Sequence, residues 1–273
     1  MILTLSSPDG TAIAYTRQGD GPAVVLVGGG LDDGAENEPL AAALSRWFTV
    51  YNYARRGRGG SGDTHPYTVD REIEDIAALI GLAGGSANVY GVSSGGALVL
   101  RAAAAGVPVD RLAVYEVPYA VDEAAVRGWR EYVTQLDAAL AMDNRDAALR
   151  LFMRLAGSGD DDIAGAVASP MWPGLLRVAH TLGYDAACLG DGEPPAAELA
   201  RVTRPALVLT GGVPDPHMGG LAPGYFDAAA DAIAAHLPNA TRLVVAGESH
   251  VADPATISVV LKDFFSVRDR SAG

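Results

Sequence analysis

The chain has 273 residues, of which 49% are hydrophobic, and it carries a formal net charge of -13 at pH 7 with a sequence pI of about 4.7. This length suits one large domain or two small ones, and the apolar fraction is ample for a packed core, so the chain need not be disordered. The negative charge disfavours a nucleic-acid backbone or an anionic membrane as the main partner. No run of about 18 uncharged apolar residues occurs, so we expect no membrane span.

The N-terminal sequence and the cysteine usage bear on the compartment. The first ten residues, MILTLSSPDG, contain no basic region, which argues against a signal peptide. The single cysteine, Cys188, excludes an internal disulfide framework and fits a reducing compartment. We therefore expect a cytoplasmic protein.

Short apolar runs alternate with helical patterns along most of the chain. Residues 2–5 and 11–17 flank the turn signal SSPDG and predict a hairpin, and the β-branched run 23–27 predicts a strand buried on both faces. Further strands are predicted at 48–53, 88–90, 111–117, 205–210 and 241–246. Apolar residues at helical spacing lie between the strands, as in 73–80 and 257–264. This order predicts an α/β fold: a mostly parallel, eight-stranded sheet with helices on both faces.

One segment breaks the alternation. No convincing strand is found between Val117 and Pro205, and the apolar residues there form helical stripes. We expect a helical cap at residues 119–197, inserted into a core made of residues 1–118 and 198–273. The candidate pocket walls in this cap are Trp129, Tyr132, Phe152, Met153 and Trp172, although such side chains more often belong to a plain core.

The stretch NVYGVSSGGALVL, residues 88–100, joins a predicted strand to a predicted helix through small residues. Gly91 to Gly95 fit the nucleophile-elbow pattern G-x-S-x-G with Ser93 at the centre, whereas centring it on Ser94 puts Val92 at the first glycine position. A strained serine between strand and helix needs small neighbours, because the two elements pass closely. Ser93 is therefore the candidate nucleophile.

A serine nucleophile needs a base, and the base needs a carboxylate that orients it, in the chain order Ser, Asp or Glu, His. Of the five histidines, His250 follows the last predicted strand and fits this order. Asp215, in a Gly/Pro loop after the strand 205–210, is the favoured acid. Glu116, at the end of the strand 111–117, stays open as the alternative acid, since a carboxylate buried there needs a partner.

The candidate oxyanion hole combines two backbone N–H groups. One belongs to Ser94, the residue after the nucleophile, and the other to the glycine-rich loop that follows the strand 23–27. In that loop either Gly30 or Leu31 is expected to be the donor. Three consecutive glycines at this place favour a close approach of the backbone.

These motifs together resemble the α/β-hydrolase superfamily over essentially the whole chain. The stretches YARRGRGGSGD (53–63), YGVSSG (90–95) and SPMWP (169–173) look most like the small capped hydrolases of actinobacterial type. The resemblance implies an eight-stranded, mostly parallel sheet, a helical cap and hydrolysis without a cofactor. One departure is that Gly28-Gly29 stands where the family usually has His-Gly, which leaves the site more open.

Two other site classes are disfavoured. GRGGSG at 57–62 satisfies G-x-G-x-x-G, but residues 63–67, with Pro66, separate it from the next predicted helix, and no strand-end acid follows about 20 residues on. We interpret that loop as structural, with its arginines paired to nearby carboxylates. We expect no metal site, because no His, Cys or Asp cluster has ligand spacing.

The sequence thus predicts a serine hydrolase that cleaves an ester, thioester or lactone of a small-molecule carbonyl substrate. A carbon–carbon hydrolase or a biosynthetic cyclase of the same fold stays open, as does a non-hydrolytic ligand-binding protein. A homodimer is also left open.

Overall fold

One mixed sheet of eight strands organises the chain, in a computed structural model that describes residues 1–267. The strands are β1 (Leu3–Ser6), β2 (Ala12–Gln18), β3 (Ala23–Val27), β4 (Thr49–Tyr53), β5 (Ala87–Val92), β6 (Val109–Tyr115), β7 (Ala206–Gly211) and β8 (Ala240–Val245). Their order in the sheet is β1-β2-β4-β3-β5-β6-β7-β8. The pairs β1/β2 and β2/β4 are antiparallel, and all the others are parallel. The predicted fold class is confirmed, and each predicted strand forms with its ends within two residues of the predicted ones.

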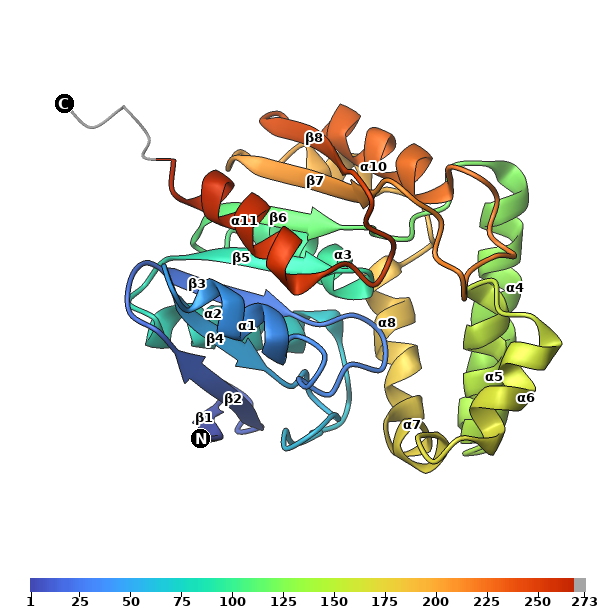
Figure 1. The fold of residues 1–273 in the computed structure, drawn as a ribbon. Helices are drawn as coiled ribbons and strands as arrows, with labels where there is room; N and C mark the ends of the chain where they lie inside the picture. The colour runs from blue at the N-terminus through green and yellow to red at the C-terminus, as the bar shows by residue number, and fades with distance from the viewer. Residues whose placement is uncertain (268–273) are drawn as a thin grey trace.

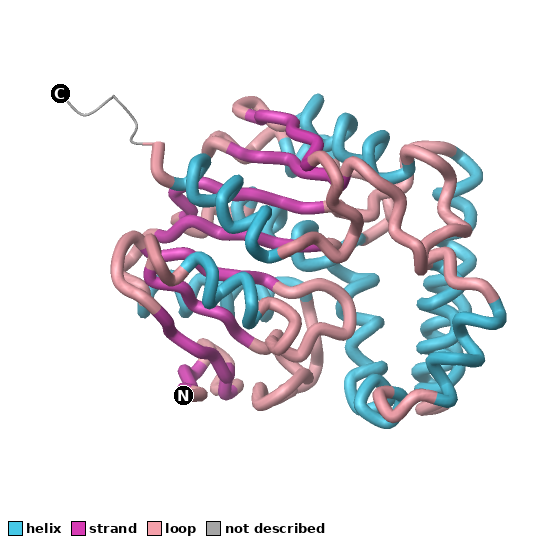
Figure 2. Tube along the Cα trace, in the orientation of Figure 1, coloured by secondary structure: helices cyan, strands magenta, loops and turns pink. Residues whose placement is uncertain are grey.

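Helices cover both faces of this sheet (Figures 1 and 2). Along β3, Val24 and Leu26 belong to one hydrophobic cluster and Val25 and Val27 to the other, as strand alternation requires for a strand buried on both faces. The first cluster includes α1 (Glu38–Leu44) and α11 (Pro254–Phe265). The second includes α2 (Val69–Leu82), α3 (Ser94–Ala104) and α10 (Tyr225–His236).

The chain between β6 and β7 is helical, and it contains no strand among the described residues. Its elements are α4 (Glu123–Ala141), α5 (Arg145–Leu155), α6 (Asp160–Ala168), α7 (Trp172–Val178), the 3-10 turn η1 (Ala179–Thr181), α8 (Leu182–Leu189) and α9 (Ala196–Leu199). Figure 1 shows α4 to α7 standing off one end of the sheet, on the side toward which β6 points. This arrangement agrees with a helical insertion, while its limits at 119 and 197 as a separate cap stay a prediction.

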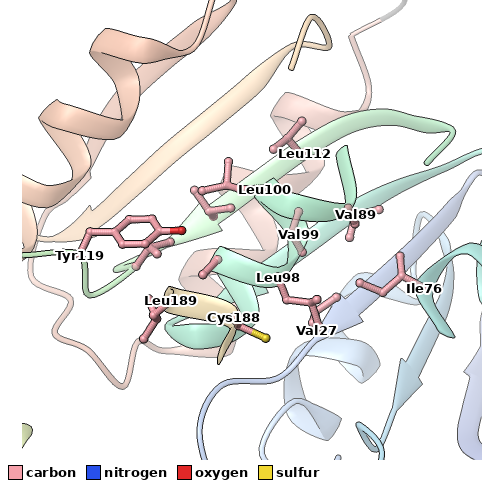
Figure 3. Packing of buried hydrophobic residues seen from close by; sticks show 14 of the residues in the cluster. Val27, Ile76, Val89, Leu98, Val99, Leu100, Leu112, Tyr119, Cys188 and Leu189 are labelled. Carbon is pink, nitrogen blue, oxygen red and sulfur yellow. The ribbon is translucent and has the colours of Figure 1, made fainter. Parts of the chain in front are cut away.

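Helices α8 and α9 of this insertion pack directly on α3, and α8 makes the more extensive contact. Figure 3 shows Cys188 of α8 near Leu98 of α3, and these two residues belong with Leu189, Leu100 and Val27 to one hydrophobic cluster. The insertion is therefore anchored on the helix that begins at the elbow. Among residues 1–267 no helix is long and apolar enough to cross a membrane.

Candidate active site

The elbow between β5 and α3 has the strained backbone that its sequence predicts. Ser93 has φ 54 and ψ -128, a conformation that non-glycine residues rarely adopt. A Cβ atom on Gly91 would lie 2.6 Å from the carbonyl oxygen of Gly95, and one on Gly95 would lie 2.4 Å from that of Gly28. The glycines are thus required by backbone crowding, and this crowding lets the Ser93 side chain line a cavity at the sheet end.

His250 lines the same cavity as Ser93 and is held by a buried carboxylate. Its Nδ1 lies 2.7 Å from Oε2 of Glu116, whose residue is only 4% exposed. An ionised carboxylate only accepts hydrogen bonds, so beside an ionised Glu116 it is Nδ1 that would carry the proton, which would leave Nε2 as the basic nitrogen. The other oxygen of Glu116 accepts the N–H of Gly211 at 2.8 Å. Glu116 is therefore fixed on both oxygens, at the end of β6.

The sequence favoured Asp215 as the acid that orients His250, but in the structure Asp215 has other hydrogen-bond partners. Asp215 follows β7, as expected, but its oxygens accept the Oγ–H of Ser249 at 3.1 Å and the backbone N–H of His217 at 2.9 Å. The carboxylate on His250 is Glu116, the alternative acid. The physical reason is that β6 and β7 are parallel neighbours, so both acids reach the same edge, and Glu116 turns toward the histidine with an unusual φ of 46°.

Two aromatic side chains support the histidine loop. Phe226, at the start of α10, stacks on the His250 ring with centroids 5.0 Å apart and an interplanar angle of 16°. The Tyr115 hydroxyl, from the end of β6, donates to the carbonyl of Ser249 at 2.5 Å. These contacts restrain the imidazole from its face and through its backbone. Sequence reasoning did not find Phe226, because no local motif links it to a histidine further along the chain.

The glycine-rich loop after β3 lies against the elbow. A Cβ on Gly29 would be 3.1 Å from Cβ of Ser93, so a larger residue there would push the loop and the elbow apart by a few tenths of an ångström. Gly30 and Ser94 line the cavity together with Ser93, whereas Leu31, which has φ 65, is not among the lining residues. Of the two candidates for the second oxyanion donor, the geometry favours Gly30.

The cavity has a volume of about 460 Å³ and mostly apolar walls. Three of the five predicted wall residues line it, namely Trp129, Tyr132 and Phe152. Met153 and Trp172 do not line the cavity. Met153 packs against the hydrophobic cluster that includes α2, α3 and α10, and Trp172 is buried with the Arg150 guanidinium over its ring. Further walls that the sequence did not reveal come from α4, α5, α8, α10 and the loop after β7, and include Asp185, Met218, Leu221, Tyr225 and Phe226.

The arginine-rich loop after β4 is structural, as interpreted from the sequence. Arg56 pairs with Asp75 and Asp9 at 2.8 and 2.9 Å. Arg55 pairs with Glu72 at 2.7 Å and, like Arg58, with Asp185 of α8 at 2.7 Å. All three guanidinium groups are buried, and each is matched by carboxylates, as buried charges must be.

Burial and ion pairing shift the pKa of these groups in opposite directions. Desolvation favours the neutral form of Asp185, but the charges of Arg58 and Arg55 outweigh it and hold the pKa of this carboxyl below its ordinary value. Burial raises the pKa of the neighbouring Cys188 thiol to about 12. Asp185 is therefore a carboxylate at neutral pH, and Cys188 is an inert thiol.

Comparison with known proteins gives the family. Residues 23–257 match the alpha/beta hydrolase family. An alpha/beta hydrolase from Sphaerobacter thermophilus DSM 20745 has a structure similar to this one, with a TM-score of 0.86 and 46% identity over 97% of this chain and 100% of that chain. The chain belongs to the alpha/beta hydrolase family and is a hydrolase of that fold.

Two further relatives add less. The enol-lactonase from Burkholderia xenovorans LB400 has a TM-score of 0.68 at 22% identity, covering 97% of this chain and 100% of that chain, which shows likeness of fold alone. The uncharacterized hydrolase YraK of Bacillus subtilis (strain 168) is 35% identical over 101 residues. That alignment spans 36% of this chain and 37% of the length of YraK.

Proposed function

We propose that the protein is a serine hydrolase that cleaves a carboxylic ester, thioester or lactone through an acyl-enzyme on Ser93. The observation that carries this proposal is the 2.7 Å contact between Glu116 and Nδ1 of His250, a histidine that lines the same cavity as the strained Ser93. A nucleophile on an elbow, an imidazole with a free Nε2 and a buried acid behind it form the parts of a catalytic triad.

The proposed reaction has two halves. Nε2 of His250 removes the Ser93 hydroxyl proton while Oγ attacks the substrate carbonyl, and the same proton then passes to the leaving alcohol, thiol or ring oxygen. Water repeats the sequence on the acyl-enzyme, releases the acid and restores Ser93. The negative charge of Glu116 stabilises the imidazolium in both halves. The N–H groups of Gly30 and Ser94 bind the oxyanion.

The walls of the cavity support an apolar substrate under a cap. Trp129 and Tyr132 of α4 and Phe152 of α5 come from the proposed cap, residues 119–197, and face the same cavity as the nucleophile. Burial of an alkyl or aryl group against such walls contributes about 25 cal/mol per Å² of apolar area. We propose that this cap sets the size of the acyl or alcohol group.

Covalent labelling tests the proposal. A fluorophosphonate probe should label the wild type and fail to label Ser93→Ala, because the probe needs an activated serine. Ser94→Ala should still label, since it keeps the backbone N–H. A panel of p-nitrophenyl esters of rising chain length, with thioesters and lactones, then defines the substrate class. A protein that neither labels nor cleaves any member of the panel would be a non-hydrolytic binder, and carbon–carbon cleavage without ester hydrolysis would indicate the other open activity of this fold.

A further inference from the structure

The Gly29–Gly30 peptide of the candidate oxyanion hole is held from behind by a buried arginine. Nη1 of Arg58 donates to the carbonyl oxygen of Gly29 at 2.5 Å, and the Arg58 side chain is 0% exposed. The carbonyl of Gly29 and the N–H of Gly30 belong to one planar trans peptide, in which they point in opposite directions. Fixing the carbonyl on Arg58 therefore aims the Gly30 N–H away from Arg58.

This peptide needs external support because glycines flank it. The sequence Gly28-Gly29-Gly30 lacks the Cβ atoms that restrict other residues, so the peptide between Gly29 and Gly30 rotates at little steric cost. An oxyanion donor is effective only when it is already oriented before the charge develops. The Arg58 contact supplies an orientation that the local sequence does not.

Arg58 is itself locked in place by the helical insertion. Its Nη2 donates to Oδ2 of Asp185 at 2.7 Å, and its Nε donates to Oγ1 of Thr181 at 2.9 Å. Asp185 lies on α8 and Thr181 on η1, just before it. The planar guanidinium is thus bonded along three edges, and a single ammonium group cannot reproduce this pattern.

Asp185 also reaches the other candidate donor. Its Oδ1 accepts the Oγ–H of Ser94 at 2.7 Å, so the same carboxylate contacts the residue that follows the nucleophile. Arg55 donates to this oxygen at 2.7 Å and keeps the charge balanced. One carboxylate of α8 is therefore connected to both sides of the oxyanion hole, directly at Ser94 and through Arg58 at Gly29.

We infer that Arg58, anchored by Asp185 of α8, is a positioning residue that orients the Gly30 N–H for oxyanion binding. This inference rests on the proposed function, since it concerns the same site. It makes the seating of α8 a condition for catalysis. It also explains why an arginine is buried behind a glycine loop where no substrate reaches it.

The test compares two buried arginines of the same loop, Arg58→Lys and Arg56→Lys. Arg56 is equally buried and also pairs with carboxylates, but it contacts Asp75 and Asp9 instead of the glycine loop. The measured quantities are kcat per active site titrated with a fluorophosphonate, KM, and the inhibition constant of an alkyl boronic acid that mimics the tetrahedral intermediate.

Arg58→Lys should lower kcat per titrated site by about 10- to 100-fold, below the 10²- to 10³-fold cost of losing a donor outright. KM should stay within about twofold, and boronate binding should weaken in parallel with kcat. Arg56→Lys should keep kcat per titrated site within about twofold, even if its melting temperature falls. Equal kcat losses in the two variants, or an unchanged kcat per site in Arg58→Lys, would overturn the inference while the proposed function stands.

Two further measurements test the inference if Arg58→Lys does not fold or if the proposed function itself fails. If Arg58→Lys does not fold, Thr181→Val removes one hydrogen bond to Arg58 without a change of charge, and a kcat per site equal to that of the wild type would then contradict the inference. If the wild type itself neither labels nor cleaves esters, the proposed function fails. The crystal structure of Arg58→Lys then decides the positioning role, since a turned Gly29–Gly30 peptide supports it and an unchanged peptide overturns it.

Discussion

Glu116 and His250 are 134 residues apart in the chain, yet Oε2 of the first lies 2.7 Å from Nδ1 of the second. This contact joins the end of β6 to the loop that precedes α11. It favours Glu116 over Asp215 as the acid that orients His250, and so it predicts how the two acids should differ on substitution.

Glu116→Gln should lower kcat by about 10³- to 10⁴-fold on a good p-nitrophenyl ester, because a neutral amide neither supports the imidazolium nor holds the required tautomer. Asp215→Asn should lower kcat by less than about tenfold, since Asp215 contacts Ser249 and His217 instead. Kinetics of the two purified variants on one ester decide the matter. The reverse pattern, with Asp215→Asn nearly inactive, would return the role to Asp215.

The choice of acid could not be predicted from the sequence for a physical reason. Asp215 and Glu116 follow adjacent parallel strands, so pattern and topology bring both to one edge of the sheet. The difference lies in the backbone, where Glu116 has a positive φ and binds the N–H of Gly211. Neither feature has a signature in a single sequence.

Phe152→Ala and Trp172→Ala should distinguish a residue that lines the cavity from one that only stabilises the core. Phe152 lines the cavity next to Gly30, so its truncation should shift the preference toward longer acyl chains with little change in acetate-ester turnover. Trp172 lies outside the cavity and is 6% exposed, so its truncation should cost about 3 to 5 kcal/mol of unfolding free energy without altering the preference. Urea unfolding and a chain-length panel measure the two effects. A shifted preference in Trp172→Ala alone would contradict this division.

The strands and the elbow, in contrast, were predictable from the sequence. Continuous apolar runs gave strands such as β3, and the glycines at 91 and 95 marked the strand-to-helix crossing. The pocket walls were predicted less well, because Phe152 and Met153 are neighbours on one helix and only packing decides which faces the cavity. The contact between Asp185 and Ser94 spans 91 residues and leaves no trace in local sequence.

Gly95→Ala and Gly81→Ala should have opposite effects on stability. A Cβ on Gly95 would meet backbone oxygens of Gly28 and Val27 at 2.4 and 2.5 Å, so we expect a loss of at least about 3 kcal/mol or a failure to fold. A Cβ on Gly81 of α2 meets nothing within 4 Å and should stabilise the helix by about 0.5 to 1 kcal/mol. Thermal and urea unfolding measure the stability change in each variant. An unaffected Gly95→Ala protein would show that the elbow is not crowded.

Asp185→Asn should destabilise the protein in a pH-dependent manner. Burial opposes the charge of Asp185, but Arg58 and Arg55 outweigh it and keep its folded-state pKa below the ordinary 3.8. The carboxylate therefore contributes stability above about pH 4, and this contribution is lost as the pH falls through the folded-state pKa. The free energy of unfolding of the wild type should exceed that of Asp185→Asn by about 3 to 5 kcal/mol at pH 7. This difference should narrow below pH 4.

Urea unfolding of both proteins at pH 7, 5 and 3.5 measures this gap. Asp20→Asn serves as the control, because the Asp20 side chain is fully exposed and should show no difference at any of these pH values. A gap that stays constant or widens toward pH 3.5 would show that the charge of Asp185 is not what stabilises the fold.

The most direct measurement of the proposed chemistry is the capture of the acyl-enzyme. Wild-type protein is mixed with p-nitrophenyl acetate, quenched in acid within the first turnover, digested and mapped by mass spectrometry. We predict that an acetyl group is found on the hydroxyl of Ser93, and that it is absent in Ser93→Ala. Ester hydrolysis with no adduct, or with the adduct on Ser94, would contradict the assignment of Ser93 as the nucleophile.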